Sequence, residues 1–462
     1  MLQSLRNIWE IPDLRKRVLF TLLMLGVYRL GAHVPTPGIN SQALIDFFEQ
    51  NRGNWMGLVD MFSGGNLGKV TVFALGIMPY ISASIILQLL TVVWPYLEKL
   101  SKEGELGRRK ITQWTRYGTV LLSIVQSLGI AAYLERMTLT DKFRIVEHPG
   151  IAFKLMCVLT LTTGTAFIMW LGEQITDRGV GNGMSLIIFA GIVVGFPRGV
   201  IDTFGKIQRG ELSLIAALLL LAMMVAVVGV IVFVERGQRR ITVQYAKRVV
   251  GRRMYGGSST HIPLKVNTGG VIPVIFASSI LAFPATIAQM FSEGSIMRRL
   301  SEQLAWGMPL YNLLYVSGII FFCYFYTAII FNPDDVAENM RKYGGFIPGI
   351  RPGKRTAEYI DTILTRITLV GALYLALVAI LPEFLINGFK VAPIPLIGEK
   401  LDAVLPRFIT EGLNVQFFFG GTSLLIIVGV AMDTVQQVES QLIMRHYDGF
   451  MKKTRIRGRR GL

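Results

Sequence analysis

Residues that could perform catalysis or bind a metal are few in this sequence and lie far apart. Two glycine-rich stretches, residues 64–69 (GGNLGK) and 349–354 (GIRPGK), resemble phosphate-binding loops, but each has three residues where the motif requires four, and no Ser or Thr follows the Lys. None of the four histidines stands at metal-ligand spacing from another: His33, His148, His261 and His446. The sequence therefore predicts no metal, no cofactor and no enzymatic activity.

Ionisable residues are also nearly absent from the apolar segments. A proton-coupled carrier normally keeps paired charges at the membrane midplane, at a cost of about 3 kcal/mol or more each. Here Arg29, Lys154 and Asp433 lie near the ends of apolar segments, where a long side chain can reach the interface. Any uphill transport would therefore draw its energy from a partner. The two cysteines, Cys157 and Cys323, lie in apolar stretches and are expected to be unpaired thiols.

The composition is typical of a membrane protein. Of the 462 residues, 52% are hydrophobic and 17% are charged, and the net charge is +17. The mean hydropathy is +0.50, whereas soluble proteins have more charged residues, about 25%. Ten apolar segments are long enough, or nearly so, to cross a bilayer as helices: residues 18–34, 70–94, 117–134, 151–172, 180–196, 212–234, 269–291, 310–331, 367–386 and 413–432.

The distribution of basic residues predicts the orientation of these segments. With the N-terminus in the cytoplasm, cytoplasmic regions hold 32 of the 47 Lys and Arg residues and the outer loops hold 14. The apolar run that begins at Val18 continues into a full span without a cleavage site, so the first helix is expected to be a retained anchor.

Several features can be explained either by ordinary packing or by a role in transport. The stretch 55–68 could be an ordinary outer loop or a broken helix that lines a transport pathway. Pro79, Pro273 and Pro284 fall within predicted spans, where each favours a kink, although neighbouring helices could simply accommodate it. Ile77 and Ile81 share a helix face, and on pattern alone core packing is the better interpretation.

Two long cytoplasmic loops could bind an acidic protein or RNA phosphates. Residues 235–265 carry eight basic residues and one acidic residue, which is more than orientation requires. Residues 332–366 have mixed charge and a turn-rich centre. Together with the basic C-terminal tail, these loops form a predicted docking surface.

Four motifs in this order resemble the SecY family, the pore subunits of the bacterial Sec protein translocase. They are residues 74–84 (ALGIMPYISAS), 169–179 (MWLGEQITDRG), 233–240 (FVERGQRR) and 346–353 (FIPGIRPG), and the resemblance extends over all ten spans. It implies an all-α membrane protein with ten transmembrane helices. Two pseudo-symmetric halves, spans 1–5 and 6–10, would surround an hourglass pore, with both termini in the cytoplasm.

The resemblance also implies functional residues. The pore constriction would be a ring of five isoleucines: Ile77, Ile81, Ile188, Ile275 and Ile426. A short plug helix at residues 60–68 would close the outer funnel: Asp60, Met61, Phe62, Ser63, Gly64, Gly65, Asn66, Leu67 and Gly68. A lateral gate between spans two and seven would use Gln88, Pro79 and Pro273, and cytoplasmic partners would dock on Arg252, Arg253 and Arg351.

The implied organisation is a cytoplasmic tail at 1–17, an N-terminal half at 18–196, an outer loop at 197–211, a C-terminal half at 212–438 and a basic tail at 439–462. The implied partners are the membrane subunits SecE and SecG, the SecA motor ATPase, the ribosome with its nascent chain, signal sequences, the lipid bilayer and accessory Sec membrane proteins. The implied location is the inner membrane of a bacterium.

The sequence thus predicts a passive, gated channel that conducts unfolded secretory polypeptides and releases hydrophobic segments sideways into the bilayer. A small-solute carrier and an intramembrane hydrolase are the alternatives. The carrier would need midplane charges, and the hydrolase a Ser/His or Asp pair within the spans. The outer stretch 387–412 departs from the usual length of the family's last outer loop.

Overall fold

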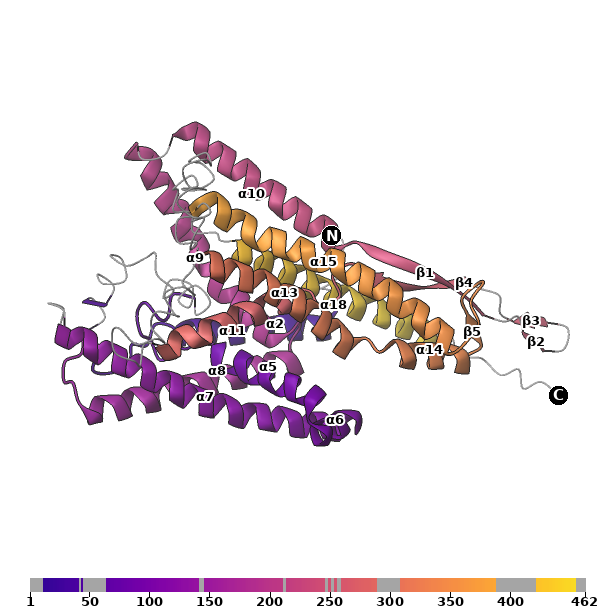
Figure 1. The fold of residues 1–462 in the computed structure, drawn as a ribbon, viewed down its shortest axis with the longest axis horizontal. Coiled ribbons are helices and arrows are strands. Elements are labelled where there is room, and N and C mark those ends of the chain that lie inside the picture. The colour runs from indigo at the N-terminus through magenta and orange to yellow at the C-terminus, as the bar shows by residue number, and fades with distance from the viewer. Residues whose placement is uncertain are drawn as a thin grey trace, which may run out of the picture. The chain divides into compact units, whose positions relative to one another are not determined.

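A computed structural model describes residues 11–40, 43–44, 64–140, 145–210, 213–245, 248–250, 253–255, 259–288, 308–387 and 421–453. The chain forms two compact units, one of residues 1–195 with 430–462 and the other of residues 196–429. Each unit is described by itself. Figure 1 shows that helices dominate both, with a small amount of sheet in the second.

Within the described residues, a helix lies at each of the ten predicted segments. These helices are α2 (Pro12–Gly31), α5 (Met78–Val93), α7 (Glu105–Thr140), α8 (Ile151–Arg178), α9 (Gly183–Gln208), α10 (Leu214–Glu235), α11 (Ile272–Ala288), α13 (Pro309–Ile330), α15 (Lys354–Asn387) and α18 (Gly421–Lys453). Six of them, α7, α8, α9, α10, α13 and α15, contain windows long and apolar enough to cross a membrane, and α5 with its continuation makes a seventh. The prediction of an all-α multi-pass membrane fold is confirmed.

The second predicted span is shorter than the sequence suggested. Thr71 forms a β-bridge with Pro35, residues 72–77 form turns, and the helix begins only at Met78. After α5 the chain bends by 99° into α6 (Pro95–Lys102), because Trp94 is extended and a proline follows it. The apolar run at 70–94 therefore contains a turn segment as well as a helix.

The short helix α6 is anchored by its apolar face. Leu97 and Leu100 are buried against Leu87 and Ile111. On the exposed side, Lys102 Nζ donates a hydrogen bond of 2.7 Å to Glu98 Oε1. This bond and the charge of Lys102 lower the pKa of the Glu98 carboxyl. The pair lies on the exposed side of α6, after the bend.

The two long loops that are predicted to be cytoplasmic contain strands that the sequence pattern did not indicate. Strands β1 (Gln238–Tyr245) and β4 (Ser259–Lys265) pair antiparallel, and β1 also pairs with β5 (Gly345–Phe346) of the other loop. A second hairpin joins β2 (Arg248–Val250) to β3 (Arg253–Tyr255). The sheet order β4-β1-β5 therefore ties residues 235–265 and 332–366 into one body.

A hydrophobic core fixes this sheet to the helices of the second unit. On β1 the burial pattern alternates, so that Ile241 and Val243 point inward. They pack in one cluster with Met340 of α14 (Pro333–Lys342) and with Ile360 and Leu364 of α15. The three-stranded sheet is thus packed against α14 and α15 of the second unit.

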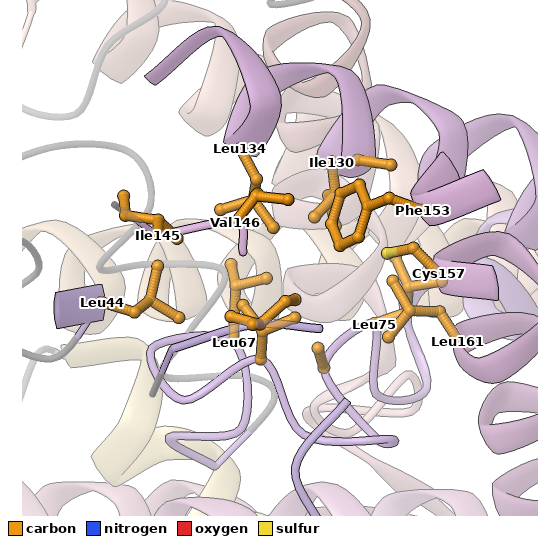
Figure 2. Packing of buried hydrophobic residues seen from close by; sticks show 14 residues of the cluster. Leu44, Leu67, Leu75, Ile130, Leu134, Ile145, Val146, Phe153, Cys157 and Leu161 are labelled. Carbon is orange, nitrogen blue, oxygen red and sulfur yellow. The ribbon is translucent and has the colours of Figure 1, made fainter. Parts of the chain in front are cut away.

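A larger core lies in the first unit and includes the turn segment before α5. Leu67, Val70 and Leu75 of that segment are buried with Ile145 and Val146 and with residues of α7 and α8 (Figure 2). The predicted state of Cys157 is confirmed, because it is an unpaired thiol buried in the same cluster. Cys323 in α13 is likewise buried and unpaired.

Candidate functional site

The isoleucines predicted for the constriction in the first unit are buried at the start of α5 and in α9. Ile77 is the N-cap residue of α5 and is 3% exposed, and Ile81 lies one turn later and is 6% exposed. The amide of Ile81 donates to the carbonyl of Ile77 over 3.1 Å. Ile188 lies in α9 and is also buried. Ile81 and Ile188 therefore stand on helices, and Ile77 lies at the turn immediately before α5.

The remaining two isoleucines belong to the second unit and are equally buried. Ile275 lies in the first turn of α11, and Ile426 lies in α18. The hydroxyls of Ser278 and Ser279 both donate to the carbonyl of Ile275, over 2.9 and 2.7 Å. These bonds satisfy the serine hydroxyls within α11, so the surface around Ile275 remains apolar.

The described half of the predicted plug is not a helix. Residues Gly64, Gly65, Asn66, Leu67 and Gly68 form turns, whereas 60–63 lie outside the described residues. Gly64 and Gly65 have φ of 74° and 80°, a left-handed conformation that glycine adopts without strain. A helix over this half was therefore a wrong expectation.

This turn segment is held closely against the rest of the first unit. A Cβ at Gly64 would lie 2.6 Å from the Cα of Gly191 in α9, so only glycine fits. The Asn66 carbonyl accepts a hydrogen bond of 3.0 Å from the amide of Thr71. The Asn66 side chain donates from Nδ2 to the hydroxyl of Tyr28 in α2 over 3.3 Å. Sequence reasoning missed Tyr28 because 38 residues separate the partners.

The prolines predicted as kinks in the gate helices begin those helices instead. Pro79 is the second residue of α5, and Pro273 is the second residue of α11. In the first turn a proline removes no helical hydrogen bond, because the amides there have no partner within the helix. Both kink predictions are therefore wrong, and each proline helps to define where its helix starts.

Gln88, the predicted polar contact of the gate, is partly buried in α5. Its Nε2 donates to Ser84 Oγ one turn earlier over 3.0 Å, and its carbonyl accepts from Thr91 Oγ1 over 2.6 Å. The bond to Ser84 lowers the cost of placing an amide on an apolar helix.

The start of α11 has a polar anchor that the sequence analysis did not identify. Asn267 Nδ2 donates to Glu235 Oε1 at the end of α10 over 2.6 Å and to the carbonyl of Gly270 over 3.0 Å. Both Glu235 and Asn267 are buried. Glu235 belongs to the FVERGQRR motif, which was the only signal in the sequence that could have indicated it.

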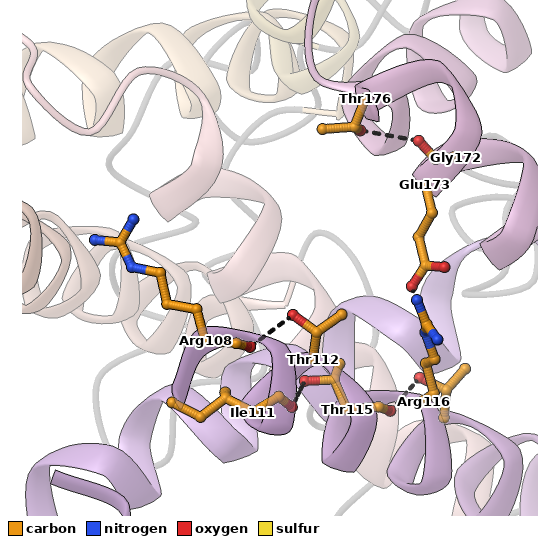
Figure 3. Close-up of polar contacts among 9 residues, drawn as sticks. Arg108, Ile111, Thr112, Thr115, Arg116, Gly172, Glu173 and Thr176 are labelled. Atoms are coloured by element: carbon orange, nitrogen blue, oxygen red, sulfur yellow. Dashed lines mark hydrogen bonds and ion pairs between the residues drawn. The ribbon is translucent and has the colours of Figure 1, made fainter. Parts of the chain in front are cut away.

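A second missed feature is an ion pair between α7 and α8. Arg116 Nε donates to Glu173 Oε1 over 2.8 Å, and the Glu173 side chain is only 16% exposed (Figure 3). The hydroxyls of Thr112 and Thr115 bond back to carbonyls of α7. Arg116 therefore links α7 to α8, a role in addition to its predicted contribution to membrane orientation.

The predicted docking residues lie in the sheet-containing loops. Arg351 is exposed, and its carbonyl accepts a hydrogen bond of 3.0 Å from Thr356 Oγ1. Arg253 is the first residue of β3, where it pairs with Val250. Arg252 lies outside the described residues, as does the outer stretch 388–412. In the ranges that the structure describes, no three His, Cys, Asp or Glu residues could hold a metal ion together.

Comparison with known proteins identifies a family with the same motifs and fold. The SecY family model matches residues 71–435. Protein translocase subunit SecY of Escherichia coli (strain K12) is 50% identical over 451 residues, which cover 97% of this chain and 96% of that protein. The SecY subunit of Aquifex aeolicus (strain VF5) is 44% identical, with 98% and 100% covered.

Solved structures show the same fold at low sequence identity. A protein-conducting channel matches with a TM-score of 0.60 and 15% identity, covering 93% of both chains. Sec61 in the canine ribosome-channel complex from the endoplasmic reticulum matches with a TM-score of 0.56 and 14% identity, again covering 93% of both chains.

Proposed function

The chain belongs to the SecY family of protein-conducting translocation channels, and we propose that it passes unfolded secretory polypeptides through a constriction of five isoleucines. The observation that carries this proposal is the burial of all five isoleucines, with Ile77 immediately before α5 and Ile81, Ile188, Ile275 and Ile426 on helices. A constriction of branched apolar side chains offers no ligand to replace the water shell of an ion, and it can dewet. The same surface can adapt to a passing polypeptide of any sequence.

We propose further that segments which are apolar enough leave sideways between α5 and α11. Burial in lipid stabilises such a segment by about 0.8 kcal/mol for each CH₂ group. Pro273 at the start of α11 and the Asn267–Glu235 hydrogen bond just before it support this assignment, since both define where α11 begins. Gln88 would provide the polar contact on α5.

The channel itself supplies no energy in this proposal. Partners would drive transport: the SecA motor ATPase or the translating ribosome, with SecE and SecG as membrane subunits and with accessory Sec membrane proteins. The canine Sec61 structure with the same fold is part of a ribosome-channel complex, which supports a ribosome as one partner. We place the protein in the inner membrane of a bacterium, in line with its bacterial relatives.

Charge reversal at Arg351 tests the docking part of the proposal. Replacing an interfacial charge by its opposite costs several kcal/mol, so we expect Arg351→Glu to lower SecA-driven transport into inverted vesicles by roughly tenfold or more. Arg351 is exposed and makes its described hydrogen bond only through the backbone, so folding and membrane insertion should be unchanged.

The matched control is Arg341→Glu, which makes the same charge change at another exposed position of the same loop, in α14. Transport by this variant should stay near the wild-type rate. Equal losses in both variants would mean that the net charge of the surface matters and that Arg351 is no specific contact. Normal transport by Arg351→Glu would remove this loop from the docking surface.

A further inference from the structure

A buried hydrogen bond joins the turn segment at 64–68 to the first membrane helix. Tyr28 of α2 is 2% exposed and Asn66 is 1% exposed, and Asn66 Nδ2 donates to the Tyr28 hydroxyl over 3.3 Å. The hydroxyl also faces α9, because a Cβ built at Gly191 would lie 3.6 Å from it. Three parts of the chain that are distant in sequence therefore meet at one phenol oxygen.

The Tyr28 ring is fixed by packing that does not depend on its hydroxyl. It stacks on Phe73 with a centroid distance of 5.8 Å and an interplanar angle of 8°, and Phe73 stacks on Phe167 of α8 at 6.0 Å. Such contacts orient an aromatic ring independently of any hydrogen bond. The hydroxyl is thus held in place, ready to accept from Asn66.

The two ends of the turn segment are held differently, the C-terminal end by side chains in the core and the N-terminal end by a backbone contact. Leu67 and Val70 belong to the core cluster of the first unit and cannot leave it without exposing apolar surface. Gly64 has no side chain to bury and touches α9 only through its backbone, at Gly191. Asn66 lies between this anchored part and the two left-handed glycines, Gly64 and Gly65.

We propose that the hydrogen bond between Asn66 and Tyr28 is a latch that holds this end of the plug in its closed position. The inference rests on the proposed function of residues 60–68 as a plug. In the closed channel the latch satisfies a buried amide and a buried hydroxyl together. When the channel opens and Asn66 moves away from α2 together with the plug, this hydrogen bond breaks. The cost of breaking it adds to the free energy of opening. The latch therefore helps to set how readily the resting channel opens.

Removal of one oxygen atom tests the latch. Tyr28→Phe keeps the ring and its stacking on Phe73 but deletes the acceptor of Asn66. A hydrogen bond of this kind changes an equilibrium by about twofold to tenfold, so the ion leak of resting proteoliposomes should rise by that factor. Asn66→Ala should raise the leak similarly, and the effect of the double variant should be smaller than the product of the single effects, because both variants remove the same bond.

A matched control is Tyr117→Phe, which removes a hydroxyl that accepts from Gln113 over 3.0 Å on the exposed face of α7. Its leak should equal that of the wild type. Thermal unfolding in detergent is measured for every variant, since a general loss of packing would lower the unfolding temperature in proportion to the leak. A latch predicts a raised leak in Tyr28→Phe at an unfolding temperature like that of Tyr117→Phe.

Deletion of residues 60–65 separates failure of the latch from failure of the plug. If that deletion raises the leak while Tyr28→Phe does not, the segment seals the channel but the latch proposal is wrong. The latch is also wrong if the single effects multiply in the double variant, because the two side chains then act independently. If the deletion leaves the leak unchanged, the segment is not a plug, and the latch proposal fails with it.

Discussion

Channels that lack residues 60–65 are expected to leak ions at rest, at about tenfold to a hundredfold the wild-type rate. The reason is that a two-state gate normally holds its minor state at roughly 1–10%, and the deletion would unseal every copy. The deletion stops before Asn66, because Leu67 is part of the core and its loss would destabilise the first unit. Potassium-driven dye response in proteoliposomes measures the leak directly.

A deletion of equal length at residues 391–396 serves as the control, because this stretch is predicted to lie on the same side of the membrane and the deletion leaves residues 60–68 in place. We expect it to leave the leak at the wild-type level. Equal leaks in the two deletions would indicate general damage. No rise in the deletion of 60–65 would mean that another part of the chain seals the resting channel.

Replacement of Ile426 by asparagine is the second large effect that we expect. The side chain is fully buried in α18, and an amide placed there without a partner costs about 1–3 kcal/mol in the closed state. The penalty is relieved when the constriction wets, so opening should become roughly tenfold more favourable or more. Precursors with defective signal sequences should then be transported.

The neighbouring residue offers a matched control in the same helix. Ile427 is half-buried and points about 100° away around the helix axis. Ile427→Asn should retain the wild-type rejection of defective signal sequences. If both variants transport precursors with defective signal sequences equally well, the effect comes from a general destabilisation of α18. If Ile426→Asn rejects such precursors as the wild type does, Ile426 is not part of the constriction.

The helical part of this fold was largely predictable from the sequence because apolar runs of about 20 residues leave few alternatives in a bilayer. Helix starts were less predictable. The apolar run at 70–94 includes the turns at 72–77, whose residues are apolar, so hydropathy alone could not separate these turns from the helix. A kink at Pro79 was one of two open interpretations because the start of α5 could not be located from hydropathy, and the proline stands in the first turn of α5.

The strands in residues 235–265 and 332–366 could not be predicted for a different reason. The many arginines of these loops indicated a charged docking surface. The alternation of the apolar residues Ile241 and Val243 with polar residues is the pattern that indicates strand β1. The pairing of β1 with β5 joins residues about a hundred positions apart, at Gln244 and Phe346. Contacts of that separation depend on the assembled helices and cannot be derived from local pattern.

The candidate site likewise has residues that continuous motifs predict and contacts that only the folded chain shows. The isoleucines and the plug were indicated by resemblance of continuous motifs to a family, and the structure adds that all five isoleucines are buried. The contacts of Asn66 with Tyr28 and of Arg116 with Glu173 join residues 38 and 57 positions apart. Neither pair lies within one motif, so only the folded chain brings them together.

The central claim is that a secretory polypeptide passes Ile275, and a photocrosslink tests it most directly. A photoreactive residue is placed at 275, a precursor is stalled during SecA-driven transport into inverted vesicles, and adducts are sought after irradiation. Val225, an exposed position of α10, is the control. We predict an adduct at 275 that requires both SecA and ATP, with none at 225. A stalled precursor that labels 225 and never 275 would contradict the proposed path.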